Sequence, residues 1–422
     1  MSPSTAPMVK STQAYITNEG HAAIANRRSE DRPVRVLYSF PHKIGAARIC
    51  HTAWQQVNGL AAAGADVVAF PGAVHRALPG NVNTRPTLAR GKLRIPYRLL
   101  GLMRACALHD RIVARRLERL AGQIDIVHVW PLGALKTLQT AARLGIPTVL
   151  ERANAHTRFA YTVVQQECER LGVTLPPGHE HAFNAEILHK EEEEYRLADR
   201  LLCPSDFVVQ TFLDQGFKKE QLIRHTYGFD QRVFFPAPRP PEAGRGLTAL
   251  FVGVCAVRKG LHHALEAWLK SPARHDGSFL IAGEFLPQYR ERLSSLLAHP
   301  SVHVLGHRND VPDLMRKSDI LILPTIEEGS PLVCAEAMGS GCVPVVSDVC
   351  IGTCKHLTNA LIHRAGDVET LTEHITMLWQ DRSLLERLRS AALSGLPDIT
   401  WTAAGVKLLE VYKTVLSAKK CA

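Results

Sequence analysis

Two glutamates bracket the start of a predicted helix in the C-terminal half of the chain. Glu328 stands just before the helical run 332–338, and Glu336 lies inside this run. Ser330 is a favourable N-cap and Pro331 suits the first helical position, so the free N–H groups of the first turn form a site for an anion such as a diphosphate. A carboxylate beside such a site can accept two vicinal sugar hydroxyls. Two acids at this spacing are therefore placed to hold a ribose and a second sugar on either side of a diphosphate.

A pair of cations follows another predicted strand of the same half. Arg258 and Lys259 lie between the strand 249–252 and a helix that begins at Leu261. Cations at this position can neutralise a departing diphosphate. Each motif has an ordinary alternative: the Arg–Lys pair could be solvated surface cations, and the two glutamates could be a capping charge and a surface residue. Two anion sites at neighbouring strand ends favour one shared pocket over that coincidence.

One histidine in the first half could reach the same ligand. His156 follows the predicted strand 148–150. If the two halves face each other, a side chain at this strand end can contact a sugar that the opposite half binds. The chain has 20 histidines, so the position of a single one is a weak indication by itself.

Several motifs are missing from the sequence. It has no D-x-D, no H-E-x-x-H and no Cys/His set with zinc spacing, so no bound metal is expected. It has neither G-x-S-x-G nor the phosphate loop G-x-x-x-x-G-K-[ST], which argues against a hydrolase triad and against an ATPase of that kind. The absence of G-x-G-x-x-G after the first strand weakens a nicotinamide-dehydrogenase interpretation.

Strands and helices alternate in both halves. Short β-rich runs are separated by longer helical stretches, which predicts βαβ units and parallel sheets. The predicted strands are 34–38, 66–70, 125–129, 147–150 and 200–205 in the first half, and 249–252, 279–282, 302–305, 320–323 and 343–346 in the second. The fold class is therefore α/β, with two Rossmann-like domains facing a cleft. Ligands bind at the carboxyl ends of strands in such sheets, where the motifs above lie.

The chain divides at a proline-rich break. Four prolines fall within 236–241, which no helix or inner strand accommodates, so 237–246 is predicted to be a stiff linker. We expect a flexible leader at 1–32, a first domain at 33–236 and a second domain at 247–400. The leader carries charged residues and no apolar core, so it does not read as a secretion signal.

The composition is that of a soluble globular enzyme. Hydrophobic residues make up 46% and charged residues 21% of the 422 residues, and no run approaches the roughly 18–20 apolar residues of a membrane span. The ten cysteines form no C-x-x-C, which fits a reducing cytoplasm. The net charge of +10 favours an anionic partner. A nucleic acid is not expected, because aromatic residues make up only 6% and form no basic stacking platform.

The segment 90–120 concentrates the positive charge. It carries nine lysines or arginines against Asp110 and Glu118, and leucines are interleaved with them. This pattern fits an amphipathic helix that lies on anionic lipid at the inner face of a membrane. A solvated outer helix of an α/β domain explains the pattern equally well.

Together these features resemble the retaining glycosyltransferases of family 4 (glycosyl transferases group 1), which have the two-domain GT-B fold. The resemblance covers most of the chain from about Val34 onward. Besides the Arg–Lys pair and the two glutamates, it rests on the segments 198–205, 227–236, 306–312 and 365–367. Tyr227 replaces the asparagine that is usual in the second of these segments.

The resemblance implies roles for individual residues. Arg258 and Lys259 would bind the donor diphosphate. Glu336 would bind the ribose, and Glu328 would lie beside the donor sugar, whose far side His156 would touch. Further donor contacts are implied for Gly45, His307, Gly329, Ser330, Pro331 and Leu332.

Departures from the family pattern limit what the resemblance implies. Gly45 is followed by Ala46 where the family often has paired glycines, so the role of this loop is open. Gly329-Ser330-Pro331 replaces the usual glycine-phenylalanine-glycine or -proline, so the identity of the donor sugar is not implied. The run 401–422 is similar to the family's C-terminal helix that crosses back to the first domain.

The resemblance implies transfer of a sugar from a nucleoside-diphosphate donor to an acceptor hydroxyl, with retained configuration and without a metal or another cofactor. A glycan or lipid-linked acceptor, in cell-surface polysaccharide or glycolipid synthesis, fits the family's usual work and the basic segment 90–120. Two alternatives stay open. One is a sugar-nucleotide epimerase on the same fold, which would consume donor without acceptor. The other is a catalytically idle partner subunit.

Overall fold

The structure is a computed structural model that describes residues 32–90, 93–94, 100–238 and 246–420. Residues 1–31 of the predicted leader, 239–245 of the predicted linker, and 91–92 and 95–99 of the basic segment lie outside the described residues.

The first domain is built on a parallel sheet. Its strands are β1 (Arg35–Ile44), β2 (Asp66–Val74), β3 (Asn83–Thr84), β6 (Ile126–Val129), β7 (Thr148–Glu151), β8 (Arg200–Cys203) and β9 (Leu222–Arg224). Within the described residues these seven strands follow the order β3-β2-β1-β6-β7-β8-β9. The chain moves outward from β1 to β3 and then returns to β6 on the other side of β1. This reversal makes a switch point between β1 and β6.

The second domain repeats this plan. Its strands are β10 (Thr248–Val252), β11 (Ser278–Ala282), β12 (Val302–Gly306), β13 (Ile320–Leu323), β14 (Val343–Ser347) and β15 (Leu361–His363). In the described part of the chain their order is β12-β11-β10-β13-β14-β15, with all pairs parallel. All four residues of β13 are buried, as expected for an inner strand covered on both faces. The switch point of this sheet lies between β10 and β13.

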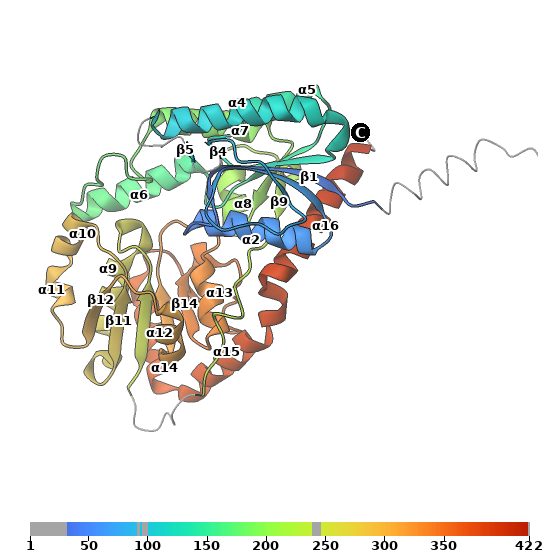
Figure 1. The fold of residues 1–422 in the computed structure, drawn as a ribbon. Helices are drawn as coiled ribbons and strands as arrows, with labels where there is room; N and C mark the ends of the chain where they lie inside the picture. The colour runs from blue at the N-terminus through green and yellow to red at the C-terminus, as the bar shows by residue number, and fades with distance from the viewer. Residues whose placement is uncertain (1–31, 91–92, 95–99, 239–245, 421–422) are drawn as a thin grey trace, which may run out of the picture.

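Helices cover both sheets (Figure 1). They are α2 (Ile49–Ala62), α4 (Leu102–Leu120), α5 (Leu135–Arg143), α6 (Thr157–Leu171), α7 (Ala185–Leu197), α8 (Asp206–Leu213), α9 (Leu261–Lys270), α10 (Pro287–Arg292), α11 (Ser294–Leu297), α12 (Val311–Lys317), α13 (Leu332–Gly339), α14 (Val368–Gln380), α15 (Arg382–Ser394) and α16 (Trp401–Lys420). A short antiparallel pair, β4 (Ala89–Arg90) and β5 (Leu93–Arg94), lies apart from the two sheets.

All ten predicted strands are present, and the α/β architecture with two parallel sheets is confirmed. The largest difference at a strand end is in β1, which runs to Ile44 rather than to Tyr38. The sequence did not predict β3, β9 or β15. These strands have two or three residues, too few for a periodic hydrophobic pattern to develop.

The helix α16 returns to the first domain, as Figure 1 shows. Leu408 and Val415 belong to the first domain's hydrophobic core. The fully buried Tyr412 hydroxyl forms a hydrogen bond of 2.6 Å with His128 Nδ1 on β6. Gly405 crosses α2 so closely that a Cβ atom there would lie 2.5 Å from the Cα atom of Gly59.

The segment around Tyr227 and Gly228, which lies between the two sheets in the sequence, is anchored to the first sheet and to α16. The Tyr227 hydroxyl donates to the buried Glu151 carboxylate at the end of β7 (2.7 Å), which also accepts from Gln56 of α2 (2.7 Å). Gly228 packs against the start of α16, where a Cβ atom would lie 2.3 Å from the Trp401 nitrogen. The tyrosine that departs from the family pattern thus fixes this segment to the first sheet.

The helix α6 joins the two domains at a second place. It begins after β7 in the first domain, and Figure 1 shows it running toward α9 and α10. Val164, Cys168 and Leu171 of α6 belong to the hydrophobic core of the second domain. Arg292 Nε of α10 donates to the Leu171 carbonyl oxygen (3.0 Å). The domains are therefore in contact through α6 as well as through α16.

The helix α4 carries the C-terminal part of the basic segment. Its Val113 and Leu117 side chains are buried against the first domain, and five arginines on the helix are exposed: Arg104, Arg111, Arg115, Arg116 and Arg119. Among the described helices, none combines the length and apolar character that a membrane span requires. Contact of this segment with an anionic membrane stays a prediction.

Candidate active site

The loops that follow β10 and β13 meet at the switch point of the second sheet. The first loop contains the short helical turn η3 (Val257–Lys259). The Thr325 hydroxyl of the second loop donates to the Arg258 carbonyl oxygen (2.7 Å). Gly260, with φ 66°, lies so close to Pro324 that a Cβ atom would fall 1.9 Å from the Pro324 oxygen. This close packing brings the cationic loop against the acidic loop.

Arg258, Lys259 and Glu328 form a charged cluster at this point. The Lys259 ammonium group donates to Glu328 Oε2, and Arg258 Nη1 lies 3.3 Å from the same oxygen. All three side chains are largely buried, with exposed fractions of 13%, 16% and 9% respectively. The structure thus brings three of the predicted site residues together at one place.

Opposing effects act on the Glu328 carboxyl group. Burial raises its pKa, but the charges of Arg258 and Lys259 outweigh burial and hold the pKa at about 2. Glu328 is therefore ionised near neutral pH and forms ion pairs with both cations. An anionic ligand bound to these cations would compete with Glu328 for them and leave its carboxylate available for sugar hydroxyls.

Glu327, to which no sequence motif assigns a role, connects this cluster to the first domain. Its fully buried carboxylate accepts a hydrogen bond from the Ala155 N–H (3.2 Å) and lies 3.3 Å from His181 Nε2 and 3.2 Å from Arg258 Nη1. Burial raises the pKa of Glu327, but His181 and Arg258 together lower it below its usual value. The only signal in the sequence was its position beside Glu328.

Gly329 lets the two domains touch at the same place. A Cβ atom there would lie 1.7 Å from the Ala153 carbonyl oxygen and 3.0 Å from the Asn154 Cα atom. Both of these residues follow β7 in the first domain. Any other residue at position 329 would therefore force the two loops apart.

The helix α13 begins one residue later than predicted. Pro331 has φ −67° and ψ 116°, which is extended rather than helical backbone, so Leu332 is the first helical residue. Within the described chain no side chain caps α13, and the prediction that Ser330 is its N-cap is wrong. Ser330 instead packs against Gly352, where a Cβ atom would lie 2.5 Å from the Ser330 hydroxyl oxygen.

Glu336 lies in the second turn of α13, half-buried beside the cluster's loop. Among the described residues, none donates a hydrogen bond to its carboxylate. Burial raises the pKa of Glu336 to about 7. The carboxylate is therefore available to a ligand, and it gains or loses its proton near neutral pH. Its contact with a ribose stays a prediction.

His156 lies buried at the start of α6. It is 1% exposed, and its ring packs among Tyr195, Phe212 and Phe217. Its Nδ1 atom accepts from the Arg158 N–H (3.2 Å) and so caps α6. Burial lowers its pKa to about 3. In this structure the histidine that follows β7 and opens α6 serves as a helix cap, and its contact with a sugar stays a prediction.

Two further predicted residues lie on loops other than those that carry the cluster. His307 is exposed after β12, which is the edge strand and is separated from β13 by β11 and β10. Gly45 directly follows β1 and has φ 81°. A Cβ atom there would lie 2.7 Å from the Arg76 Cβ atom. Glycine is required at this turn by its backbone, and a role of either residue toward a donor stays a prediction.

A cavity of about 360 Å³ adjoins the cluster on the first-domain side. His181, which contacts Glu327, also lines this cavity. Its walls combine the Arg152 guanidinium group with the Trp130 ring, and Phe183, 62% exposed, lies among its lining residues. A second, partly apolar ligand could therefore be held next to the charged cluster.

Comparisons with known proteins identify the family to which this chain belongs. The family model described as Glycosyltransferase Family 4 matches residues 51–231, and the model described as Glycosyl transferases group 1 matches residues 246–381. The two matches fall on the two domains in turn. The chain therefore belongs to glycosyltransferase family 4 and has the GT-B fold.

Curated relatives match over shorter stretches. An N,N'-diacetylbacillosaminyl-diphospho-undecaprenol alpha-1,3-N-acetylgalactosaminyltransferase of Campylobacter jejuni is 31% identical over 119 residues, which is 28% of this chain and 31% of the relative. The lipopolysaccharide glucosyltransferase WaaG of Escherichia coli K12 is 32% identical over 114 residues, 26% of this chain and 30% of the relative. Each match thus spans about a third of the relative's own length.

Solved structures share the fold over nearly the whole chain. HepE of Anabaena in complex with UDP has a TM-score of 0.63 at 15% identity, and the match covers 90% of this chain and 100% of HepE. A sucrose-phosphate synthase of Thermosynechococcus elongatus has a TM-score of 0.67 at 16% identity, with 92% and 100% covered. At this level of identity the likeness shows the fold alone.

Proposed function

We propose that the protein transfers a sugar from a nucleoside-diphosphate sugar to a hydroxyl group of a glycan or lipid-linked acceptor, with retention of the anomeric configuration. The observation that carries this proposal is the buried cluster of Arg258, Lys259 and Glu328 at the switch point of a family-4 chain. The names of the relatives support the acceptor class, because they act on undecaprenol-linked sugars and lipopolysaccharide. HepE, which shares the fold, binds UDP.

The cluster suits a reaction in which negative charge develops on a leaving group. The bond between the sugar's anomeric carbon and the diphosphate oxygen breaks, and Arg258 and Lys259 neutralise the released diphosphate. Groups that are already oriented toward such charge stabilise a transition state without reorganisation. These two cations take the role of charge neutralisation in this proposal, so that no metal ion is required for the transfer.

The proton and the new bond complete the transfer. The acceptor hydroxyl oxygen bonds to the anomeric carbon on the face that the diphosphate leaves, and its proton passes to a phosphate oxygen of the leaving group. The diphosphate displaces Glu328 from Lys259, and the Glu328 carboxylate then accepts hydrogen bonds from hydroxyl groups of the sugar. The Glu336 carboxylate accepts hydrogen bonds from the ribose hydroxyls. The cavity beside His181 binds the acceptor substrate.

A panel of UDP-, GDP- and ADP-sugars tests the proposal directly. The full chain should release nucleoside diphosphate from at least one donor, and the release should rise strongly when a polyprenol-linked or lipopolysaccharide-type acceptor is added. The anomeric coupling in the NMR spectrum of the product should match that of the donor. Donor conversion that needs no acceptor would identify an epimerase, and absence of donor binding in calorimetry would identify an idle subunit.

A further inference from the structure

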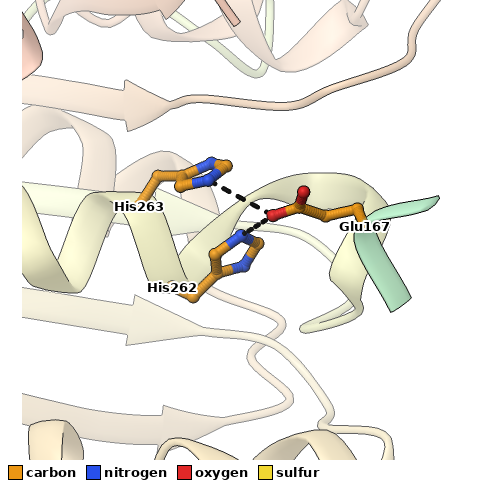
Figure 2. Close-up of side chains that lie close together, drawn as sticks. All are labelled: Glu167, His262 and His263. Atoms are coloured by element: carbon orange, nitrogen blue, oxygen red, sulfur yellow. Dashed lines mark hydrogen bonds and ion pairs between the residues drawn. The ribbon is translucent and has the colours of Figure 1, made fainter. Parts of the chain in front are cut away.

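Three side chains from the two domains converge where α6 meets α9 (Figure 2). Glu167 comes from α6, and His262 and His263 come from the first turn of α9. Glu167 Oε1 lies 2.6 Å from His262 Nε2 and 3.3 Å from His263 Nε2. Figure 2 shows both rings turned toward the one carboxylate. The two histidines are buried, and the glutamate side chain is 15% exposed.

The set has the chemistry and spacing of a transition-metal site. The three ligand atoms lie within 4.8 Å of one another. In a tetrahedral Zn²⁺ site with bonds of about 2.0–2.2 Å, ligand atoms stand roughly 3.3–3.5 Å apart. The His263–Glu167 separation already has this value, and the His262–Glu167 hydrogen bond would lengthen by less than about 1 Å. Two imidazoles and one carboxylate leave the fourth position to water, as in His₂Glu sites.

The atoms behind His262 also fit. Tyr289 OH lies 2.7 Å from His262 Nδ1 and accepts the His262 backbone N–H (2.9 Å). A phenol oxygen can accept twice, so it can receive a proton on Nδ1 and leave Nε2 free to bind a metal. His263 Nδ1 is buried without a hydrogen-bond partner among the described residues.

One cation competes for the same carboxylate. Arg170, one turn further along α6, donates to Glu167 through Nη2 (2.6 Å), and the same nitrogen lies 3.4 Å from His263 Nε2. Its side chain is 53% exposed, so it can turn into solvent at small cost. A metal ion would replace this guanidinium group as the partner of Glu167.

We propose that Glu167, His262 and His263 form a binding site for a Zn²⁺-class transition-metal ion that joins the two domains. The site is separate from the donor cluster and independent of the proposed sugar transfer. Because one ligand comes from the first domain and two come from the second, a bound ion fixes α6 against α9 and stabilises this arrangement of the domains.

Metal titration of the full chain tests the proposal. Protein dialysed against EDTA and then against metal-free buffer is titrated with ZnCl₂ in a calorimeter, and with CoCl₂ while the visible absorption of tetrahedral Co²⁺ is followed. We expect one site per chain, an increase in Tm with Zn²⁺, and at least tenfold weaker binding in Glu167→Gln and in His263→Gln. Arg170→Gln should bind Zn²⁺ more tightly than the unmodified chain, because the competing cation is gone.

A matched control separates this site from the other histidines. His303 is exposed on β12 and lies outside the cluster, so His303→Ala should bind Zn²⁺ as the unmodified chain does. Circular dichroism of each variant confirms that it is folded. Unchanged affinity in both Glu167→Gln and His263→Gln, or weaker binding in Arg170→Gln, would overturn the proposal.

Discussion

At the scale of single residues, Lys259 forms an ion pair that the donor substrate must break. Lys259 forms an ion pair with Glu328 in this structure. In the proposed reaction it pairs with the leaving diphosphate instead. Replacing it by alanine removes a charge that acts mainly in the transition state. We expect Lys259→Ala to lower kcat about 100- to 1000-fold, with a smaller change in KM, in steady-state assays of nucleotide release.

The chain supplies a matched control for this variant. Lys270 ends α9, is exposed and pairs only loosely with the exposed Glu369 (3.6 Å). Lys270→Ala makes the same chemical change outside the cluster and should leave kcat within about twofold. Equal effects of the two substitutions would remove Lys259 from the proposed reaction.

Glu336 gives donor binding a pH dependence. Burial raises its pKa to about 7, and only the ionised carboxylate can accept hydrogen bonds from both ribose hydroxyls. Donor affinity should therefore be constant above about pH 7 and should fall below it, approaching tenfold per pH unit. Calorimetry with the nucleotide sugar between about pH 5.5 and 8.5 measures this slope.

The Glu336→Gln variant is the control for that slope. It keeps the shape of the side chain but cannot ionise, so donor binding should be weaker above pH 7 and independent of pH around it. A variant that keeps the slope of the unmodified protein would assign the titration to another group.

Sequence reasoning at this scale worked where a side chain's place along one strand–loop–helix unit decided its role. Arg258, Lys259 and Glu328 follow neighbouring strands and do meet. It gave no sign that His156 caps α6 and packs against Phe212, because that packing depends on contacts that no local pattern records. Glu327 was missed because its partner His181 lies 146 positions away in the chain.

At the scale of elements, the crossing of α2 and α16 depends on two glycines. A Cβ atom on Gly405 would lie 2.4–2.5 Å from backbone atoms of Gly59, closer than real contacts allow. Gly405→Ala gains up to about 1 kcal/mol of helix propensity, but overpacking costs about 1–3 kcal/mol. We expect the free energy of unfolding in urea to fall by about 1–2 kcal/mol.

A glycine directly after α15 serves as the comparison. At Gly395 a Cβ atom would meet its nearest neighbour, the Ala392 oxygen, at an ordinary 3.7 Å. Gly395→Ala should therefore change the unfolding free energy by less than about 0.5 kcal/mol. If the two variants unfold at the same urea concentration, the close crossing does not limit stability.

Elements were predictable to the extent that they carried a repeating pattern. The buried strand β13 reads as four apolar residues in a row and was placed at its observed ends, Ile320 and Leu323. The start of α13 was predicted one residue early, because the choice between Ser330 and Pro331 as cap depends on the backbone angle of Pro331. Two-residue strands such as β3 gave no pattern to read.

At the scale of the whole molecule, Gly329 sets how closely the domains meet. A Cβ atom there overlaps the Ala153 oxygen at 1.7 Å, so Gly329→Ala must separate the loops that hold Glu327 against Ala155. We expect turnover to fall at least tenfold while Tm changes by only a few degrees, since each domain keeps its own core. Steady-state assays and thermal unfolding measure the two effects.

A glycine on the surface controls for the added methyl group. Gly122 has no atom within 4 Å of a built Cβ position, so Gly122→Ala should leave both turnover and Tm unchanged. Loss of activity in both variants would mean that the domain contact at Gly329 is not the cause.

The contacts between domains were the part of the molecule least accessible from sequence. The helix α6 reads as an ordinary amphipathic helix, and nothing local indicates that Val164 and Leu171 pack into the other domain. For the same reason no spacing motif brings Glu167 together with His262 and His263, since 95 positions separate the glutamate from the first histidine. Such sites arise from the domain arrangement rather than from spacing along the chain.

The return of α16 has a consequence for the order in which the molecule folds. Leu408, Tyr412 and Val415 complete the core of the first domain, although they are translated after the whole of the second domain. While the ribosome is still making the second domain, the face of α2 that α16 will cover is exposed to water. The first domain therefore reaches its final packing last, after its neighbour can already have folded.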